Sequence, residues 1–77
     1  MLYQVKVNPI IKRNVIKAFR EIHSRRVYHG DVRCENILVR PDNSVVIIDF
    51  ERSEMNVDPV WLNDEMKEVK HLLASLK

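Results

Sequence analysis

A short polar segment between two β-branched runs most constrains how this chain can fold. Residues 37–40 read "ILVR" and residues 45–48 read "VVII", and "PDNS" separates them. Branched aliphatic residues favour strands, whereas Pro, Asp, Asn and Ser each favour turns. The pattern predicts a β-hairpin whose loop is the four residues 41–44.

The predicted loop also fixes which residues of the hairpin face each other. With that loop, Ile37 lies opposite Ile48 and, one pair further out, Asn36 lies opposite Asp49. Directly opposed residues of an antiparallel pair have Cβ atoms roughly 4.5–5.5 Å apart. An amide oxygen and a carboxylate would therefore meet at the open end of the hairpin, and such hard oxygen donors suit Mg²⁺. A slip of one residue would destroy this pairing.

A second acidic residue, Asp31, precedes the same end of the hairpin, and Arg33 follows it by two positions. A carboxylate beside a bound metal and its phosphates is placed to accept a proton from a hydroxyl group, and an arginine there can neutralise phosphate charge. Taken alone, Asp31 is a turn or cap residue, Asn36 a turn former and Asp49 a strand terminator. Their common position at one end of a hairpin favours the metal site.

Two amphipathic helices are predicted on either side of the hairpin. The first begins with Asn8 as N-cap and Pro9 as first residue, and it fades over residues 24–26. The second begins between residues 59 and 64, after a predicted loop at residues 52–58. Residues 2–7 are predicted to be a short strand or a loop. Apolar residues recur at helical spacing in both helices: Ile11, Val15, Phe19 and Ile22 in the first, and Leu62, Met66, Val69, Leu73 and Leu76 in the second.

Composition excludes several classes of function. The 77 residues allow a single small domain, and 13 basic against 11 acidic residues leave no basic stripe for nucleic acid. No apolar run reaches the roughly 18 residues that a membrane span needs, and no signal peptide is evident. Cys34 is the only cysteine, and the three histidines lack cysteine partners at metal-ligand spacing. We therefore expect neither a disulfide nor a structural metal, and a reducing, cytoplasmic setting.

Two motifs in the sequence resemble functional segments of a known protein superfamily. "HGDVRCEN" (residues 29–36) resembles the catalytic loop of the protein-kinase-like superfamily, and "IIDFE" (residues 47–51) resembles the metal-binding D-F-G segment that follows it. The resemblance covers residues 8–52 well. It implies an α+β fold, a partial C-terminal lobe of the kinase fold with the order helix, catalytic loop, β-hairpin, loop and helix.

The same resemblance assigns roles to the residues at the hairpin end. Asp31 would be the catalytic base, and Asn36 and Asp49 would bind Mg²⁺ and, through it, ATP. Arg33 would stabilise the transferring phosphate, and His29 would hold the loop by packing and hydrogen bonding. The partners implied are ATP and a hydroxyl-bearing substrate.

Departures from the family pattern carry information of their own. Gly30, the only glycine in the chain, replaces an arginine that reads a phosphate on the activation loop, so such control is not expected. A lone glycine also marks a positive φ or a close backbone approach. Glu51 replaces the glycine of D-F-G. "HGD" and "DFE" are more similar to the aminoglycoside and choline phosphotransferase branch, so the acceptor is either a protein hydroxyl or a small-molecule alcohol.

The family also places an aspartate on a helix in this region to support the catalytic loop. Asp64 is the candidate for that role, although Asp64, Glu65 and Glu68 together are typical of a solvated helix face.

The sequence has no G-x-G-x-x-G loop and no lysine of the "VAIK" type. The resemblance therefore implies that residues 1–77 are a single partial kinase-like domain without its nucleotide-binding N-terminal lobe, inactive alone. The alternative is a non-catalytic remnant that acts as a protein-binding module. Its apolar helix stripe and one face of its hairpin would then bind a partner protein or a second copy of the chain. Whether the chain is an enzyme stays open at this point.

Overall fold

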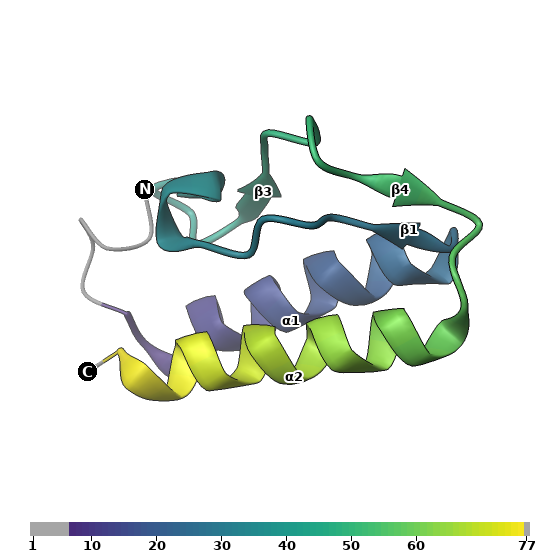
Figure 1. The fold of residues 1–77 in the computed structure, drawn as a ribbon. Coiled ribbons are helices and arrows are strands. Elements are labelled where there is room, and N and C mark those ends of the chain that lie inside the picture. Colours follow the sequence, from purple (N-terminus) through teal and green to yellow (C-terminus); the bar gives the residue numbers. More distant parts are fainter. Residues whose placement is uncertain (1–6, 77) are drawn as a thin grey trace.

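A computed structural model describes residues 7–76 of the chain. Two long helices lie side by side, and two small antiparallel sheets lie against them (Figure 1). This arrangement confirms the predicted α+β fold class. In chain order the elements are α1 (Pro9–Ser24), β1 (Val27–Tyr28), the short 3-10 helix η2 (Cys34–Asn36), β2 (Ile37–Val39), β3 (Val45–Ile47), β4 (Glu54–Met55) and α2 (Pro59–Ser75).

Helix α1 begins at its predicted cap, and α2 begins at Pro59, the first residue of the range predicted for its start. The Asn8 side chain accepts a hydrogen bond of 2.8 Å from the Ile11 amide, and Pro9 is the first residue of α1. Asp58 caps α2 in the same way by accepting a hydrogen bond of 2.9 Å from the Val60 amide. None of the helices in the described part of the chain is long and apolar enough to cross a membrane.

The two predicted apolar stripes face each other and form the core. The most buried residues of each stripe belong to the core cluster. Ile22, Met66 and Leu76, which also belong to the stripes, are partly buried and pack against this cluster. The core cluster consists of Ile11, Val15, Phe19, Ile37, Val69 and Leu73. The α2 stripe is therefore buried within this structure, and it cannot also serve as the partner-binding surface that the alternative function requires.

The β2–β3 hairpin is present, but the predicted register is wrong by one residue. Ile37 pairs with Ile47, not with Ile48. The reason lies in the turn, where the Arg40 amide donates to the Ser44 carbonyl at 2.9 Å and Asn43 adopts a φ of +69°. A left-handed residue at this position makes a three-residue loop, and the strands consequently pair one step earlier than a four-residue loop would allow.

A second pairing lies outside the predicted elements. Strand β1 pairs with β4 with Val27 opposite Met55, within the segment 52–58 that was predicted to be a loop. The prediction of a loop is wrong for the two residues of β4. Both are exposed, so the sequence has no alternation of buried and exposed residues that would mark a strand. The strand or loop predicted at residues 2–7 lies, apart from Val7, outside the described residues.

Candidate active site

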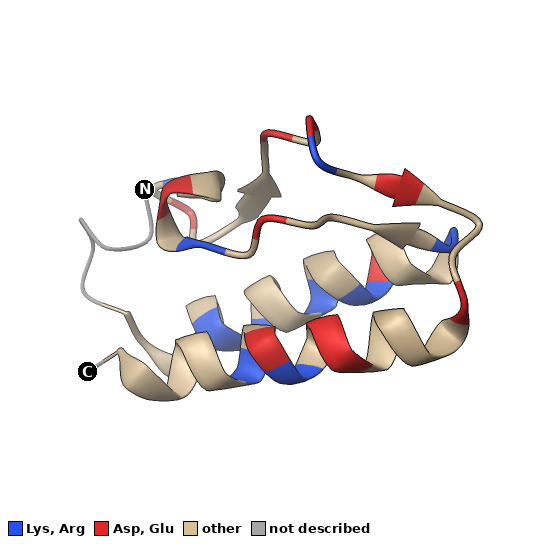
Figure 2. Ribbon diagram, viewed as in Figure 1, with Lys and Arg blue, Asp and Glu red and all other residues tan. Residues whose placement is uncertain are grey.

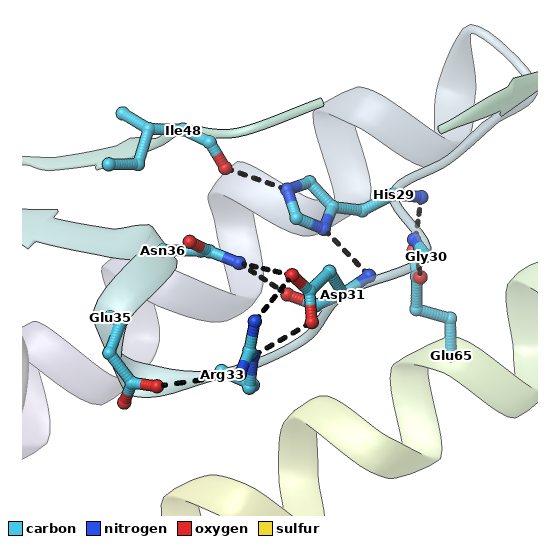
Figure 3. A network of polar contacts seen from close by, with 8 residues as sticks. All are labelled: His29, Gly30, Asp31, Arg33, Glu35, Asn36, Ile48 and Glu65. Carbon is cyan, nitrogen blue, oxygen red and sulfur yellow. Dashed lines mark hydrogen bonds and ion pairs between the residues drawn. The ribbon is translucent and has the colours of Figure 1, made fainter. Parts of the chain in front are cut away.

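The centre of the site is Asp31, in the loop between β1 and η2. Its Oδ1 accepts a hydrogen bond of 2.8 Å from Nε of Arg33, and its Oδ2 accepts from Nη2 of Arg33 at 2.9 Å and from Nδ2 of Asn36 at 3.1 Å (Figure 3). These bonds lower the pKa of Asp31, with the Arg33 hydrogen bond as the largest cause and Asn36 as a smaller one. Asp31 is therefore an ionised acceptor at neutral pH.

Arg33 lies at the solvent side of this network. Its side chain is 59% exposed, whereas that of Asp31 is 14% exposed. The Asp31 carboxylate raises the pKa of Arg33, and the more distant carboxylates of Glu35 and Asp49 add to the effect. The guanidinium group is thus held by Asp31, lies 4.0 Å from Glu35 and remains largely exposed to solvent.

Asn36 is buried and bridges the loop to the hairpin. Its Nδ2 donates to the Asp31 carbonyl at 2.8 Å, and its own backbone carbonyl accepts a bond of 2.9 Å from the Ile48 amide. Figure 3 shows Oδ1 turned away from Asp31, and in the described part of the chain this oxygen takes part in no hydrogen bond. The amide is therefore oriented with a free oxygen acceptor.

Asp49 does not lie where the sequence predicts. Because Asn36 faces Ile48 across the hairpin, Asp49 is one residue beyond the paired position, and no hydrogen bond joins it to Asn36 in residues 7–76. Its φ of +63° interrupts the alternation of the strand, so the direction of its side chain does not follow from the pleat. Asp49 directly follows Ile48, whose amide bonds the Asn36 carbonyl, and its charge is the smallest of the causes that raise the pKa of Arg33. Figure 2 shows acidic residues in both loops concerned, before η2 and after β3.

His29 holds the loop against β3, as the sequence predicts. Its side chain is fully buried, its Nδ1 accepts a bond of 3.1 Å from the Asp31 amide, and its Nε2 lies 2.8 Å from the Ile48 carbonyl. Since Nδ1 accepts from an amide, the ring carries its proton on Nε2 and donates to Ile48. Phe50 packs edge-to-face on the ring at 4.8 Å between centroids.

Glu65 supports the loop from α2, and the prediction of Asp64 for this role is wrong. Its Oε1 accepts a bond of 2.9 Å from the His29 amide and its Oε2 accepts one of 2.8 Å from the Gly30 amide, while Asp64 is exposed (Figure 3). Glu65 is only 1% exposed and therefore does not belong to a solvated face. A signal was present, because Glu65 follows Leu62 by three residues and so lies on the apolar stripe of the helix.

Gly30 is required by the backbone around it. Its φ is +88°, and a Cβ at this position would overlap the Arg52 carbonyl oxygen and lie 3.1 Å from the carbonyl carbon. Both reasons that predict a glycine here, a positive φ and a close approach, are confirmed. An arginine at this position, as the resemblance to regulated protein kinases would imply, cannot be accommodated without moving the backbone.

Two side chains near the open end of the hairpin carry oxygen atoms that could bind a metal ion. In the described range, no group of three or more His, Cys, Asp or Glu side chains is placed to hold a metal. The hairpin end offers the oxygen of Asn36 and the carboxylate of Asp49. Mg²⁺ is usually held by one or two carboxylates together with water and substrate phosphates, so a small oxygen donor set of this kind suits it.

The known proteins that are similar to this chain include several kinases. The chain is 26% identical over 70 residues to the 3-deoxy-D-manno-octulosonic acid kinase of Vibrio cholerae, a match that covers 91% of this chain and 30% of that protein. It is 34% identical over 65 residues to the serine/threonine-protein kinase pak-1 of Caenorhabditis elegans, covering 70% of this chain and 11% of the kinase. The chain thus spans less than a third of either relative. No solved structure shows significant similarity to it.

A family model matches nearly the whole chain. The model describes the lipopolysaccharide kinase (Kdo/WaaP) family, and it covers residues 2–76. The Asp31 network, the buried histidine and the supported glycine lie inside this match, as do both motifs that resemble the protein-kinase-like superfamily. The chain belongs to the lipopolysaccharide kinase (Kdo/WaaP) family, a kinase-like group of phosphotransferases.

Proposed function

We propose that the chain carries the catalytic loop and the metal-binding segment of an ATP-dependent kinase, which transfers the γ-phosphate to a hydroxyl acceptor. The observation that carries the proposal is the convergence of Arg33 and Asn36 on the ionised carboxylate of Asp31. Phosphoryl transfer needs positioning and charge stabilisation more than covalent chemistry, and this group supplies both.

Asp31 is proposed as the catalytic base and Arg33 as the residue that meets the transferring phosphate. In the structure, Arg33 occupies both oxygens of Asp31. Because its side chain is largely exposed, Arg33 is free to turn from Asp31 to an arriving phosphate group. That movement would release an oxygen of Asp31 to accept the proton of the substrate hydroxyl. Asn36 would keep the carboxylate in place through its remaining hydrogen bond.

Asn36 Oδ1 and the Asp49 carboxylate are proposed as the ligands of Mg²⁺, and through it of ATP. The ion, when bound, would neutralise charge on the phosphates. The free Oδ1 of Asn36 supports this assignment, and so does the place of Asp49 in the chain, directly after the residue that pairs with Asn36.

We propose a sugar hydroxyl as the acceptor, ahead of a protein hydroxyl. The matching family is described as lipopolysaccharide kinases, and one relative is a kinase of 3-deoxy-D-manno-octulosonic acid. The serine/threonine kinases among the relatives match shorter parts of the chain. A cytoplasmic location, where ATP is available and Cys34 stays reduced, completes this proposal.

We further propose that residues 1–77 are a partial kinase-like domain, the core of the C-terminal lobe, and are inactive alone. A single glycine leaves no glycine-rich loop to cover ATP within these residues. Turnover would then need a nucleotide-binding lobe, whereas weak binding of Mg²⁺·ATP would not. Of the two surfaces that the alternative of a non-catalytic binding module requires, the α2 stripe is buried in the core.

The experiment is a titration of the folded chain with Mg²⁺·ATP, followed by NMR so that weak binding is detected. We expect saturable shifts of the loop amides that are lost in Asp49→Asn and retained in Asp42→Asn, an equivalent change at the closed end of the same hairpin. Shifts that survive in Asp49→Asn, or no shifts in a chain shown to be folded, would contradict the proposal. Asp31→Asn should retain binding, because Asp31 is not proposed as a metal ligand.

A further inference from the structure

A cavity between β1 and α2 takes no part in the proposed mechanism. Its volume is about 310 Å³, and it is lined by Tyr28 of β1 and by Trp61, Asp64 and Glu68 of α2. The three α2 residues follow one another at intervals of three and four, so they lie on one face of the helix. Ligand sites have volumes of roughly 300–1,000 Å³, so this aromatic–acidic cavity suits a single side chain or a small head group.

Two aromatic rings line the aromatic–acidic cavity. The rings of Tyr28 and Trp61 meet edge-to-face, with 5.5 Å between their centroids and 74° between their planes. Trp61 is nevertheless 48% exposed, so part of its indole ring is open to solvent. The face of an aromatic ring carries partial negative charge and attracts cations, and indole does so most strongly.

Carboxylates add full negative charge beside the rings. Asp64 and Glu68 lie one helical turn apart, a spacing at which like charges repel and destabilise a helix. On the side of the sheet, Glu54 of β4 pairs with Tyr28, and Figure 2 shows acidic residues on both β4 and α2. Among residues 7–76, no lysine or arginine lies within ion-pair distance of any of these three acids.

The hydroxyl of Tyr28 reflects this charge. Burial is the largest cause that raises its pKa. The further causes that raise the pKa of Tyr28 are four carboxylates: Glu65, Glu68, Glu54 and Asp64. The cavity therefore combines an exposed aromatic face with a negative potential that the described residues do not balance by an ion pair.

We propose that the aromatic–acidic cavity binds the guanidinium group of an arginine side chain that a partner protein presents. A guanidinium group is planar, so it stacks on an aromatic face while its N–H groups donate to carboxylates in a fork. The cavity offers both features on one helix face, the indole of Trp61 and the carboxylate of Asp64. An ammonium group is more strongly hydrated and does not stack in this way, so lysine fits less well. This binding does not depend on the proposed phosphotransfer.

The competing explanation is that Trp61 only packs on Tyr28 and that the acids form a solvated helix face. Three tripeptides, acetylated and amidated, separate these explanations, with a central arginine, lysine or citrulline between two glycines. Citrulline has nearly the shape of arginine but carries no charge. Trp61 is the only tryptophan, so ¹⁵N-tryptophan labelling gives a single indole resonance as the readout. We expect the arginine peptide to shift this resonance saturably, the lysine peptide to bind severalfold more weakly, and the citrulline peptide to leave the resonance in place.

Substitutions in the chain test the role of the carboxylates. Asp64→Asn combined with Glu68→Gln removes both charges and should weaken binding of the arginine peptide about tenfold, as for the loss of two exposed ion pairs. Both acids are exposed and repel each other, so the urea midpoint of this double variant should not fall. Glu21→Gln, which changes an exposed glutamate of α1, is the matched control and should leave the affinity unchanged.

An indole resonance that the arginine peptide does not move, or that citrulline moves equally, would overturn the proposal. Unchanged affinity in the double variant would overturn it too, and tighter binding of the lysine peptide would refute the assignment to guanidinium. A second copy of the chain also presents arginines, since Arg13 and Arg20 are exposed on α1. An indole resonance that moves with chain concentration alone would therefore assign the cavity to self-association and refute the partner protein. No ATP enters these measurements, so a failure of the proposed function leaves their outcome unaffected.

Discussion

Replacement of Gly30 by alanine should bring the chain close to its limit of stability. The positive φ of +88° costs an L-residue about 1–2 kcal/mol. The added Cβ would also overlap the Arg52 carbonyl, and relieving such overpacking by backbone movement costs about 1–3 kcal/mol. The sum, about 2–5 kcal/mol, compares with the roughly 3–5 kcal/mol that the core of so small a domain supplies.

Urea unfolding followed by circular dichroism and by fluorescence of the single tryptophan, Trp61, measures this loss. Gly30→Asn separates the two causes, because asparagine tolerates a left-handed backbone but still carries a Cβ. We expect Gly30→Asn to recover part of the loss and Gly30→Arg, which also carries a Cβ and lacks that tolerance, to recover none. An unfolding midpoint of Gly30→Ala equal to that of the unsubstituted chain would refute the reasoning from both the dihedral angle and the close approach.

Three further predictions concern the loop support, the charge of the base and the core. Glu65→Leu leaves two loop amides without an acceptor and should lower the free energy of unfolding, measured by urea titration, by about 2–4 kcal/mol. Glu65→Gln keeps one acceptor oxygen and should lower it by less. Arg33→Ala should raise the pKa of Asp31, measured by ¹³C NMR of its carboxyl group, because the Arg33 hydrogen bond is the largest cause of its lowered value. Since the pKa of Asp31 is lowered in the folded state, the stabilisation by this ion pair is present above the ordinary pKa of 3.8 and is lost as the pH falls through the pKa of the folded state. A titration midpoint of Asp31 that is the same in Arg33→Ala and in the unsubstituted chain would contradict this account. Phe19→Ala should cost about 3–5 kcal/mol in calorimetric unfolding, whereas Ile10→Ala, at an exposed position of the same helix, should cost less than about 0.5 kcal/mol.

The parts of the fold that the sequence predicts are those governed by local interactions. Asn8 and Pro9 mark the start of α1 because a cap acts within one helical turn. The two apolar stripes identify the buried faces because their period is a property of each helix alone. Gly30 is identified correctly for the same reason, since a lone glycine reflects the conformation of its own backbone.

The parts that the sequence does not predict depend on a choice between nearly equal local states or on a distant partner. The hairpin register depends on the left-handed conformation of Asn43, and "PDNS" is compatible with a loop of three or four residues. Strand β4 exists only because β1 offers it a partner. Glu65 and Asp64 are adjacent acids, and only the packing of α2 on α1 decides which one is buried.

The error of one residue in register removes the predicted pairing of Asn36 with Asp49, but it leaves Asp31 and Asn36 together. Asp31 and Asn36 are held by contacts to backbone atoms: the Asp31 amide is bound by His29, and the Asn36 side chain is bound to the Asp31 carbonyl. These contacts lie within a few residues of each other, so they form whichever way the hairpin is paired. Asp49 has no such local anchor among residues 7–76, and its backbone is left-handed, with a φ of +63°. The loop is therefore built as a local unit, and its position on the fold is set from outside by Glu65 on α2 and the Ile48 carbonyl after β3. Substitutions at these outer supports should move the whole unit, whereas substitutions within it should change its chemistry.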